Sequence, residues 1–360
     1  MPLRIELRAE PSRAMGLATP LLATALCVLC GSGLFVFLGL EPMVVFRTFF
    51  VSPFRDLYSI GELSLKVAPL ALCATGLAIG FRANVWNIGA EGQIIVGAMA
   101  GGGLGLAFSD TVSAWLLPAM FLAGSLGGMV WAAIPAFLKV RFDTNEILVT
   151  LMLTYVAGLL LSYMVYGPWR APSGYGWPES EPLHAAARLP RLLEGARLNS
   201  GIVIALVVVG ASWLFVARSH VAYQMQVAGM APRAARYGGF ERSRMIWIGL
   251  LAGGACAGLA GVVEVAGTIG KLRDTVSPGY GFAAIIVAFI GRLHPGGILL
   301  ASVLMGLFYV GGEAAKVSLG LPTAIIGVFQ GMLLFFLLMS DLLLTYRVRW
   351  RVRIGDAADA

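Results

Sequence analysis

The chain has 360 residues, of which 58% are hydrophobic and only 12% charged, and its mean hydropathy is +0.83. A soluble domain carries about 25% charged residues, so this composition excludes a soluble protein and indicates an integral membrane protein. The formal net charge of +7 does not indicate a nucleic-acid partner, because the basic residues lie in short loops and at the two ends, as the positive-inside rule describes.

The hydrophobic pattern predicts an all-α membrane protein, because a transmembrane helix needs about 20 mostly apolar residues and many such segments follow one another. About ten spans are expected, at 15–40, 62–81, 88–108, 112–138, 146–167, 200–217, 245–268, 281–291, 297–316 and 320–345. The first is too long for the apolar core of a signal peptide and is expected to stay as an uncleaved span. The eighth is short, so it is either a compressed span or half of a broken helix.

The distribution of arginine and lysine predicts the orientation. Basic residues gather at the amino terminus, after the fourth span, in the loop at 218–244 and in the tail. Ten crossings put all four regions on the cytoplasmic side, so both termini are expected in the cytoplasm. We divide the chain into 1–60 (amino terminus, first span and external loop), 61–345 (membrane core with the cytoplasmic loop at 218–244) and 346–360 (basic tail).

Two apolar runs broken by glycines, 84–108 and 274–308, cross in opposite directions in this topology. Paired, interrupted segments in the two halves of a transporter point to a substrate site near the membrane midplane. Two interpretations stay open: an inverted repeat that relates spans two to five to spans seven to ten, or two halves without that relation.

No motif for catalysis or metal binding is found. The sequence lacks H-E-x-x-H and G-x-S-x-G, and its three histidines have no metal-ligand spacing. Residues 267–271 resemble a phosphate loop only faintly, since Val265 and Leu272 replace its first glycine and its hydroxyl residue. We therefore expect a transport protein that is not an enzyme and binds no metal or cofactor; ATP, if it drives transport, is used by another polypeptide.

Polar residues stand at the mouth of the third span, in N-V-W-N-I-G-A-E-G-Q at 84–93. One interpretation is structural: Asn87 caps a helix that starts at Ile88, and Glu91 lies in its first turn, where the helix dipole favours an acid. The other is functional, because an ionisable residue in a membrane span is a candidate site residue. It assigns to the wall of a passage Asn84, Trp86, Asn87, Glu91, Gln93 and Tyr155.

The cytoplasmic loop predicts a short helix, because Pro232 suits a first helical turn and Gly238 or Gly239 suits the end. A short helix with small residues can press into a groove on a partner. The alternative is an interfacial loop whose arginines meet lipid phosphates. The residues assigned to partner coupling are Gly229, Pro232, Arg233, Ala234, Ala235 and Gly239.

Three stretches carry a family resemblance: N-V-W-N-I-G-A-E-G-Q-I-I-V-G-A at 84–98, A-G-M-A-P-R-A-A-R-Y-G-G-F at 228–240 and S-P-G-Y-G-F-A-A-I-I-V-A-F-I-G-R-L-H-P-G-G at 277–297. Together they resemble the permease family of ATP-binding-cassette (ABC) importers for branched-chain amino acids, simple sugars and nucleosides. The match covers about 60–345 and is nearest to the longer permease of nucleoside importers. Arg292 and His294 depart from the small or polar residues expected there.

The resemblance implies a multi-pass protein of the bacterial plasma membrane that imports its substrate by alternating access. It also implies a second permease subunit, a separate ABC ATPase that uses the ATP, and an extracytoplasmic substrate-binding protein. An ion-coupled secondary transporter is the alternative, and it would need carboxylates at mid-membrane depth. Glu264 and Glu313 instead lie near the outer ends of their spans.

The substrate is expected to be a nucleoside, which is flat, uncharged and rich in hydroxyls and so calls for rings and amides rather than ion pairs. The deeper spans carry few charges and hold Trp86, Tyr155, Tyr163, Phe289, Asn87, Gln93 and Gln330. Simple sugars fit this inventory almost as well, and branched-chain amino acids remain an alternative within the family.

Overall fold

The computed structural model describes residues 3–7, 13–109, 113–172, 176–193, 195–322 and 324–350. The chain folds as two compact units, Met1–Arg47 with Lys316–Ala360 (unit 1) and Thr48–Ala315 (unit 2). The division into 1–60, 61–345 and 346–360 concerns membrane topology and stays a prediction.

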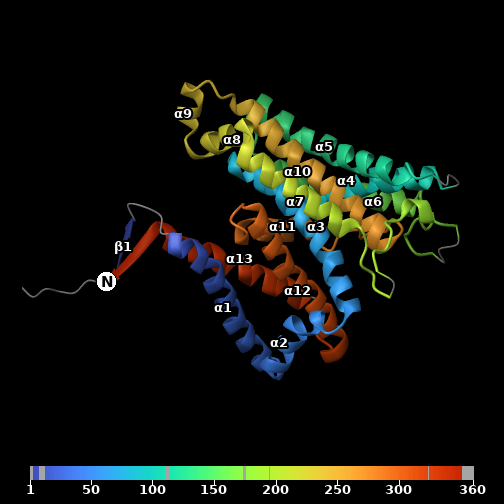
Figure 1. Ribbon diagram of the computed structural model, residues 1–360, viewed down its shortest axis with the longest axis horizontal. Coiled ribbons are helices and arrows are strands. Elements are labelled where there is room, and N and C mark those ends of the chain that lie inside the picture. Colours follow the sequence, from blue (N-terminus) through green and yellow to red (C-terminus); the bar gives the residue numbers. More distant parts are fainter. Residues whose placement is uncertain are drawn as a thin grey trace, which may run out of the picture. The chain divides into compact units, whose positions relative to one another are not determined.

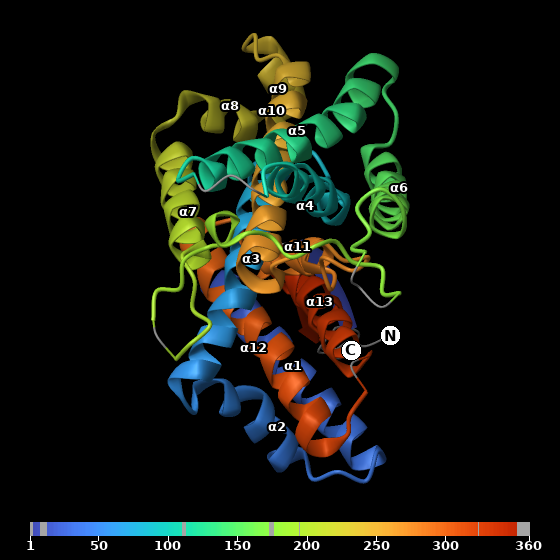
Figure 2. The same ribbon diagram turned by 90° about the vertical axis from the view of Figure 1, so that its right-hand side faces the viewer.

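Helices dominate both units (Figures 1 and 2). Unit 1 contains β1 (Leu3–Leu7), α1 (Arg13–Phe37), most of α2 (Pro42–Phe50), α13 (Ala324–Thr345) and β2 (Tyr346–Trp350). Unit 2 begins with the 3-10 turn η1 (Ser52–Phe54), followed by α3 (Leu57–Arg82), α4 (Ala90–Ala107), α5 (Leu116–Phe142), α6 (Glu146–Tyr166), the 3-10 turn η2 (Ala185–Ala187) and α7 (Gly201–Arg218). It continues with α8 (His220–Met230), α9 (Pro232–Tyr237), α10 (Arg242–Val263), the π-helical turn η3 (Glu264–Ile269), α11 (Tyr280–Ile290) and most of α12 (Pro295–Leu319).

The prediction of an all-α membrane protein with about ten apolar segments is confirmed, since a helix occupies each predicted span. Within the described residues, six helices are long and apolar enough to cross a membrane: α3, α5, α6, α7, α10 with η3, and α12. Two helices were not predicted. Helix α2 lies in the expected external loop, and α8 precedes the short helix that was expected in the cytoplasmic loop.

Unit 1 brings the two ends of the described chain together. Strand β1 pairs antiparallel with β2, with Leu3 opposite Trp350. Helices α1 and α13 also pack together, through the stacked rings of Phe35 and Phe329, whose centroids lie 5.4 Å apart. The pairing of β1 with β2 is compatible with the predicted even number of membrane crossings, which would leave both ends on one side of the membrane.

The core of unit 2 forms around α10, which packs against α3, α4 and α5 (Figures 1 and 2). Glycines allow this close approach. A Cβ added at Gly258 would overlap the carbonyl oxygen of Gly124, and one at Gly254 would overlap that of Gly128. Similarly, a Cβ at Gly97 would overlap Gly258 itself. Small residues at helix interfaces are the usual means of tight packing between membrane helices.

Helix α11 is the short segment that the sequence predicted near 281–291. Its 11 residues extend about 16 Å, roughly half of the hydrocarbon core of about 30 Å. It starts after Gly279, whose φ of 93° suits only a residue without a Cβ. The length supports the interpretation as half of a broken helix over that of a compressed span.

Candidate substrate passage and coupling surface

Three aromatic rings meet where α3 turns into α4. Phe81 lies in the last turn of α3, Trp86 lies in the turn that follows, and Phe289 lies in the last turn of α11. Their ring centroids are 5.2 Å (Phe81–Trp86), 5.4 Å (Phe81–Phe289) and 5.7 Å (Trp86–Phe289) apart, with planes inclined by 38°, 21° and 24°. Asn84, which has a φ of 55°, fixes the central ring by accepting a hydrogen bond from its indole N–H at 2.9 Å. We call these rings the aromatic stack.

The two buried amides predicted near the passage bind each other. Asn87 Nδ2 donates to Gln93 Oε1 at 2.9 Å, and Gln93 Nε2 donates to Asn87 Oδ1 at 3.3 Å. Both side chains are almost inaccessible, at 2% and 1% exposure. Buried polar groups are tolerated when they are paired in this way, so the amides form a closed polar pair inside unit 2.

The predicted cap at Asn87 was wrong in its details. Helix α4 begins at Ala90, and Gly89 occupies its N-cap position without a side-chain cap bond. Asn87 Oδ1 instead accepts from the N–H of Gly89 at 3.0 Å, and Thr150 of α6 accepts from the N–H of Ile88 at 3.2 Å. The chain therefore makes one further turn, held by side chains, before the helix starts.

Glu91 lies in the first turn of α4, as predicted, but its carboxylate serves the start of another helix. Oε1 accepts from the N–H of Gly279 at 3.2 Å, and Oε2 accepts from the N–H of Gly281 at 2.7 Å. Both N–H groups belong to the amino-terminal end of α11, where the helix dipole favours an anion. Gly281 has no room for a side chain, because a Cβ there would overlap the backbone of Glu91. The carboxylate, only 6% exposed, thus joins the two interrupted segments that the sequence singled out.

The structure does not bring Tyr155 close to the aromatic stack, the amide pair or Glu91. Helix α6 faces α4 with Thr150 and Thr154, against which Gly89 and Gly92 are closely packed. Tyr155 points to a different face and is 65% exposed. Its assignment to the passage is therefore not supported by the geometry of this chain.

The sequence analysis did not assign three residues of this region to the passage: Phe81 of the aromatic stack, and Gly279 and Gly281, which bind Glu91. The last two lie in S-P-G-Y-G-F, the third stretch that carried the family resemblance. Two glycines around a helix start are a sequence signal for a close backbone approach, but they do not reveal which side chain approaches.

The short helix predicted in the loop at 218–244 is confirmed as α9. Pro232 stands at its first position, Gly238 is its C-cap and Gly239 follows with a φ of 77°. Pro232, Arg233, Ala234 and Gly239 are exposed. Ala235 is only 3% exposed, so its methyl group packs within this chain, whereas Ala234 presents its methyl group outward.

Helix α8 approaches the end of α3 at Gly229. A Cβ at Gly229 would overlap the carbonyl oxygen of Arg82. The predicted coupling residues therefore fall into two groups. Pro232, Arg233, Ala234 and Gly239 form an exposed surface, which we call the coupling surface, whereas Gly229 and Ala235 attach that surface to the rest of unit 2.

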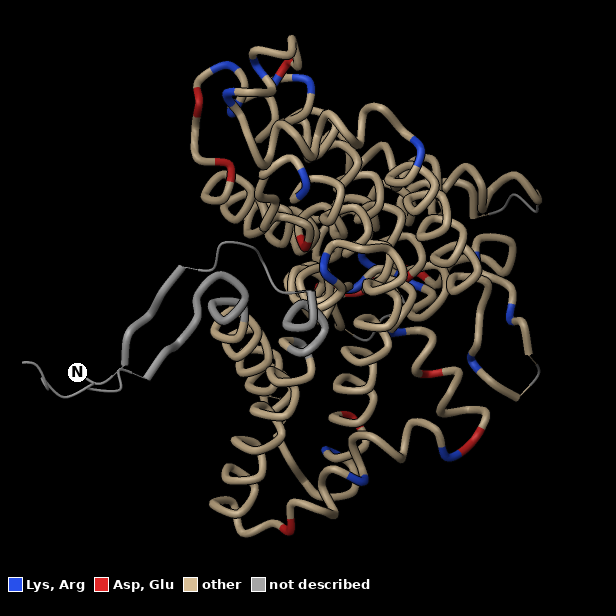
Figure 3. The backbone as a smooth tube through the Cα atoms, turned by 60° about the vertical axis from the view of Figure 1, so that its left-hand side comes forward, with Lys and Arg blue, Asp and Glu red and all other residues tan. Residues whose placement is uncertain are grey.

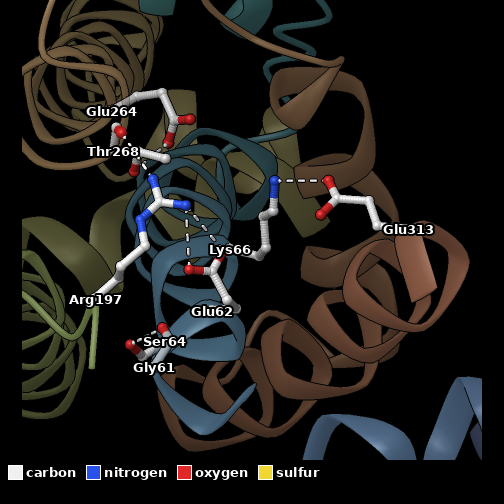
Figure 4. A network of polar contacts seen from close by, with 8 residues as sticks. All are labelled: Gly61, Glu62, Ser64, Lys66, Arg197, Glu264, Thr268 and Glu313. Carbon is white, nitrogen blue, oxygen red and sulfur yellow. Dashed lines mark hydrogen bonds and ion pairs between the residues drawn. The ribbon is translucent and has the colours of Figure 1, made fainter. Parts of the chain in front are cut away.

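Charged residues of unit 2 lie mainly in loops and at helix ends (Figure 3). Two ion pairs lie near the start of α3, where Arg197 binds Glu62 at 3.2 Å and Lys66 binds Glu313 at 3.0 Å (Figure 4). Glu264 is buried and accepts a hydrogen bond from the hydroxyl of Thr268 at 3.3 Å. Carboxylates with these partners are typical of structural networks, which weakens the case for an ion-coupled transporter. Within the described residues, no three histidine, cysteine, aspartate or glutamate side chains gather as a metal site requires.

A family model described as "Branched-chain amino acid transport system / permease component" matches residues 59–338. The chain belongs to this family. It is 32% identical to the glucose ABC transporter permease protein TsgB13 of Haloferax volcanii, over 96% of this chain and 94% of that protein. It is 28% identical to the guanosine ABC transporter permease protein NupP of Bacillus subtilis, over 91% and 94% of the two chains. The nucleoside ABC transporter permease protein NupB of Lactococcus lactis is 25% identical, over 88% and 89%.

Membership of the family makes this protein a permease subunit of an ABC transporter. Such a permease works with an ATPase and a substrate-binding partner, and its apolar helices make it a multi-pass protein of the plasma membrane. The family description names branched-chain amino acids, and the relatives are named for glucose, guanosine or nucleosides, so the family alone leaves the substrate open among these classes.

Proposed function

We propose that this permease imports nucleosides, and that the aromatic stack lies on their route. The observation that carries the proposal is the stacking of Phe289 on both Phe81 and Trp86, with ring planes inclined by 21° and 24°. A nucleobase presents the same kind of flat face as these rings. Two of the relatives described above are named for guanosine or nucleosides, which agrees with this choice.

The energies of stacking are compatible with a nucleobase taking the place of one ring of the aromatic stack. An aromatic pair contributes about 0.5–1.5 kcal/mol beyond its buried area, so separating two pairs in the stack costs about 1–3 kcal/mol. Stacking of a base on an aromatic side chain returns about 1–3 kcal/mol. A nucleobase that replaces one ring therefore enters at little net cost, while a solute without a flat apolar face does not recover the loss.

The same geometry supports alternating access. Helix α11 carries one ring of the stack near its end and is held by Glu91 at its start. Because Phe289 and the N–H groups that bind Glu91 belong to the same 11-residue helix, a movement of α11 changes the stack and the carboxylate site together. ATP-driven closure of the ATPase domains would reach this region through the coupling surface.

The proposed assembly contains this chain, a second permease subunit, an ABC ATPase that binds the ATP, and an extracytoplasmic substrate-binding protein. This chain binds no cofactor of its own. Both termini and the coupling surface face the cytoplasm, in agreement with the pairing of β1 and β2 and with the basic residues of the loop. The expected location is the bacterial plasma membrane.

A sugar is the second candidate, and the 32% identity to a glucose permease favours it. Sugars also pack against aromatic rings, through their C–H faces. The aromatic stack therefore favours both nucleosides and sugars over branched-chain amino acids. It distinguishes less well between nucleosides and sugars.

Competition in proteoliposomes tests the proposal. The complete transporter, with its ATPase and binding protein, should take up a labelled purine nucleoside when ATP is supplied. Unlabelled nucleosides should compete, whereas leucine, ribose and glucose should not. Uptake that glucose or ribose inhibits and nucleosides leave unchanged would replace the nucleoside proposal with the sugar alternative.

A further inference from the structure

The carboxyl-terminal end of α11 is tied to α3 by one charged side chain. Arg82, in the last turn of α3, donates from Nη2 to the carbonyl oxygen of Leu293 at 2.6 Å. Arg292 and Leu293 both have a φ of 55°, so the chain turns sharply after α11 and presents this carbonyl to the guanidinium. With Glu91 at its start, α11 is held at both ends by a charged side chain from another helix.

The backbone of the same arginine touches the cytoplasmic loop. The carbonyl oxygen of Arg82 occupies the space that a Cβ of Gly229 would need, so α8 and the end of α3 are in direct backbone contact. Continuous contacts therefore lead from the coupling surface through α8 to Arg82, from its guanidinium to the end of α11, and along α11 to Glu91.

The surroundings of the Arg82 guanidinium leave space for its hydrogen bonds to change. A cavity of about 410 Å³ lies between the ends of α3 and α8 and the turn after α11. The Nε–H of Arg82 is buried and has no hydrogen-bond partner within the described residues. A guanidinium has five N–H donors in a rigid fork, so it can keep one carbonyl while it gains or loses a second. A side chain that can change its hydrogen-bond partners in this way suits the coupling of distant sites, which requires an element with two arrangements.

We propose that Arg82 is a positioning residue that transmits movement of the coupling surface to α11 and thereby to Glu91 and the aromatic stack. The inference rests on the assignment of the chain as an ABC permease and on the coupling surface. It does not depend on whether the cargo is a nucleoside or a sugar.

Hydrogen exchange in the complete transporter tests this proposal without any cargo. Amide exchange of residues 279–290 is measured by mass spectrometry in lipid nanodiscs, without nucleotide and after trapping with ATP and vanadate. Wild type should show a change of at least about tenfold in exchange rate between the two states. Arg82→Gln should lose this change while vanadate trapping persists, because a neutral amide replaces the charge-assisted bond to Leu293. Arg82→Lys, which keeps the charge and can donate to Leu293 but lacks the planar fork of the guanidinium, should recover part of this change.

The matched control is Arg218→Gln, since Arg218 stands in the last turn of α7 as Arg82 does in α3. This substitution removes a charge at the carboxyl terminus of a helix other than α3. Amide exchange of residues 279–290 in Arg218→Gln should therefore respond to nucleotide as it does in wild type. Gly229→Ala perturbs the same contact from the side of α8 and leaves the guanidinium in place, so it serves if Arg82→Gln does not assemble. It should also abolish the response. An undiminished response in Arg82→Gln or Gly229→Ala, or an equal loss in Arg218→Gln, would overturn the proposal.

Discussion

Replacing Glu91 by glutamine separates a simple helix-dipole contribution from a role in the transport cycle. The carboxylate accepts from two N–H groups of α11, one with each oxygen. The amide of Glu91→Gln has nearly the same volume but only one acceptor oxygen, so one N–H group loses its partner and faces an NH₂ group instead. The substitution also removes the negative charge from the amino-terminal end of α11.

The structure allows the magnitude to be worked out. If Glu91 served only the dipole of α4, the loss would be about 0.3–1 kcal/mol and import would change little. The loss of a charge-assisted hydrogen bond costs about 1.5–3 kcal/mol. If α11 must be held in this way during the cycle, import should slow by about ten- to a hundredfold, because about 1.4 kcal/mol corresponds to a factor of ten.

The assay compares initial rates of ATP-driven uptake at equal membrane abundance. Glu146→Gln is the matched control, because Glu146 occupies the first turn of α6 and pairs there with Lys139. It removes the same charge near a helix start without leaving a backbone N–H group unpaired, and Lys139 keeps its ion pair with Asp143 at 3.1 Å, so its rate should stay near that of wild type. Uptake by Glu91→Gln within a factor of two of wild type would refute the reasoning, and the carboxylate would then be only a local cap.

Three further outcomes are expected. Ala234→Glu should leave the protein in the membrane but reduce import per ATP hydrolysed by about tenfold or more, because it puts a charge on the coupling surface. Ala235→Glu should lower membrane abundance instead, since that methyl group is buried within the chain; equal effects of both on abundance would contradict the assignment. Trp86→Leu should raise the KM for nucleosides by about five- to a hundredfold, given about 1–3 kcal/mol for one stacking contact. The exposed Trp115 supplies the control, Trp115→Leu, and equal KM values for both variants would exclude the stack from the route. The pKa of Asp56 lies below its usual range because the backbone N–H of Ser59 donates to its carboxylate at the start of α3. This stabilisation is present above the ordinary pKa and is lost as the pH falls through the lowered folded pKa, so Asp56→Asn should flatten the acid branch of a plot of thermal midpoint against pH.

The sequence alone determined where the long apolar helices lie, because hydrophobic length and backbone breakers act locally, whereas α2 and α8 escaped prediction. A run of about 20 apolar residues must be helical in lipid, where every backbone polar group needs an internal partner. Pro232 and Gly238 likewise fix the two ends of α9 by their own backbone preferences. The shortness of α11 follows in the same way from the glycines on either side of it.

Which face each helix presents was decided only by the tertiary structure. Helices that are apolar all round carry no stripe of polarity to indicate their buried side, so the outward direction of Tyr155 could not be read from α6. The same holds for the different burial of Ala234 and Ala235, which are neighbours on one short helix.

The sequence also did not predict which residues pair over long distances along the chain. Glu91 is favoured in the first turn of any helix, and that local rule correctly places an acid there. Its hydrogen bonds, however, go to Gly279 and Gly281, nearly 190 residues further along the chain. Arg82 and Leu293 are even further apart, at 211 residues. A local signal can indicate that a helix end needs a charge, but only the packing of α3, α4 and α11 decides which helix end receives it.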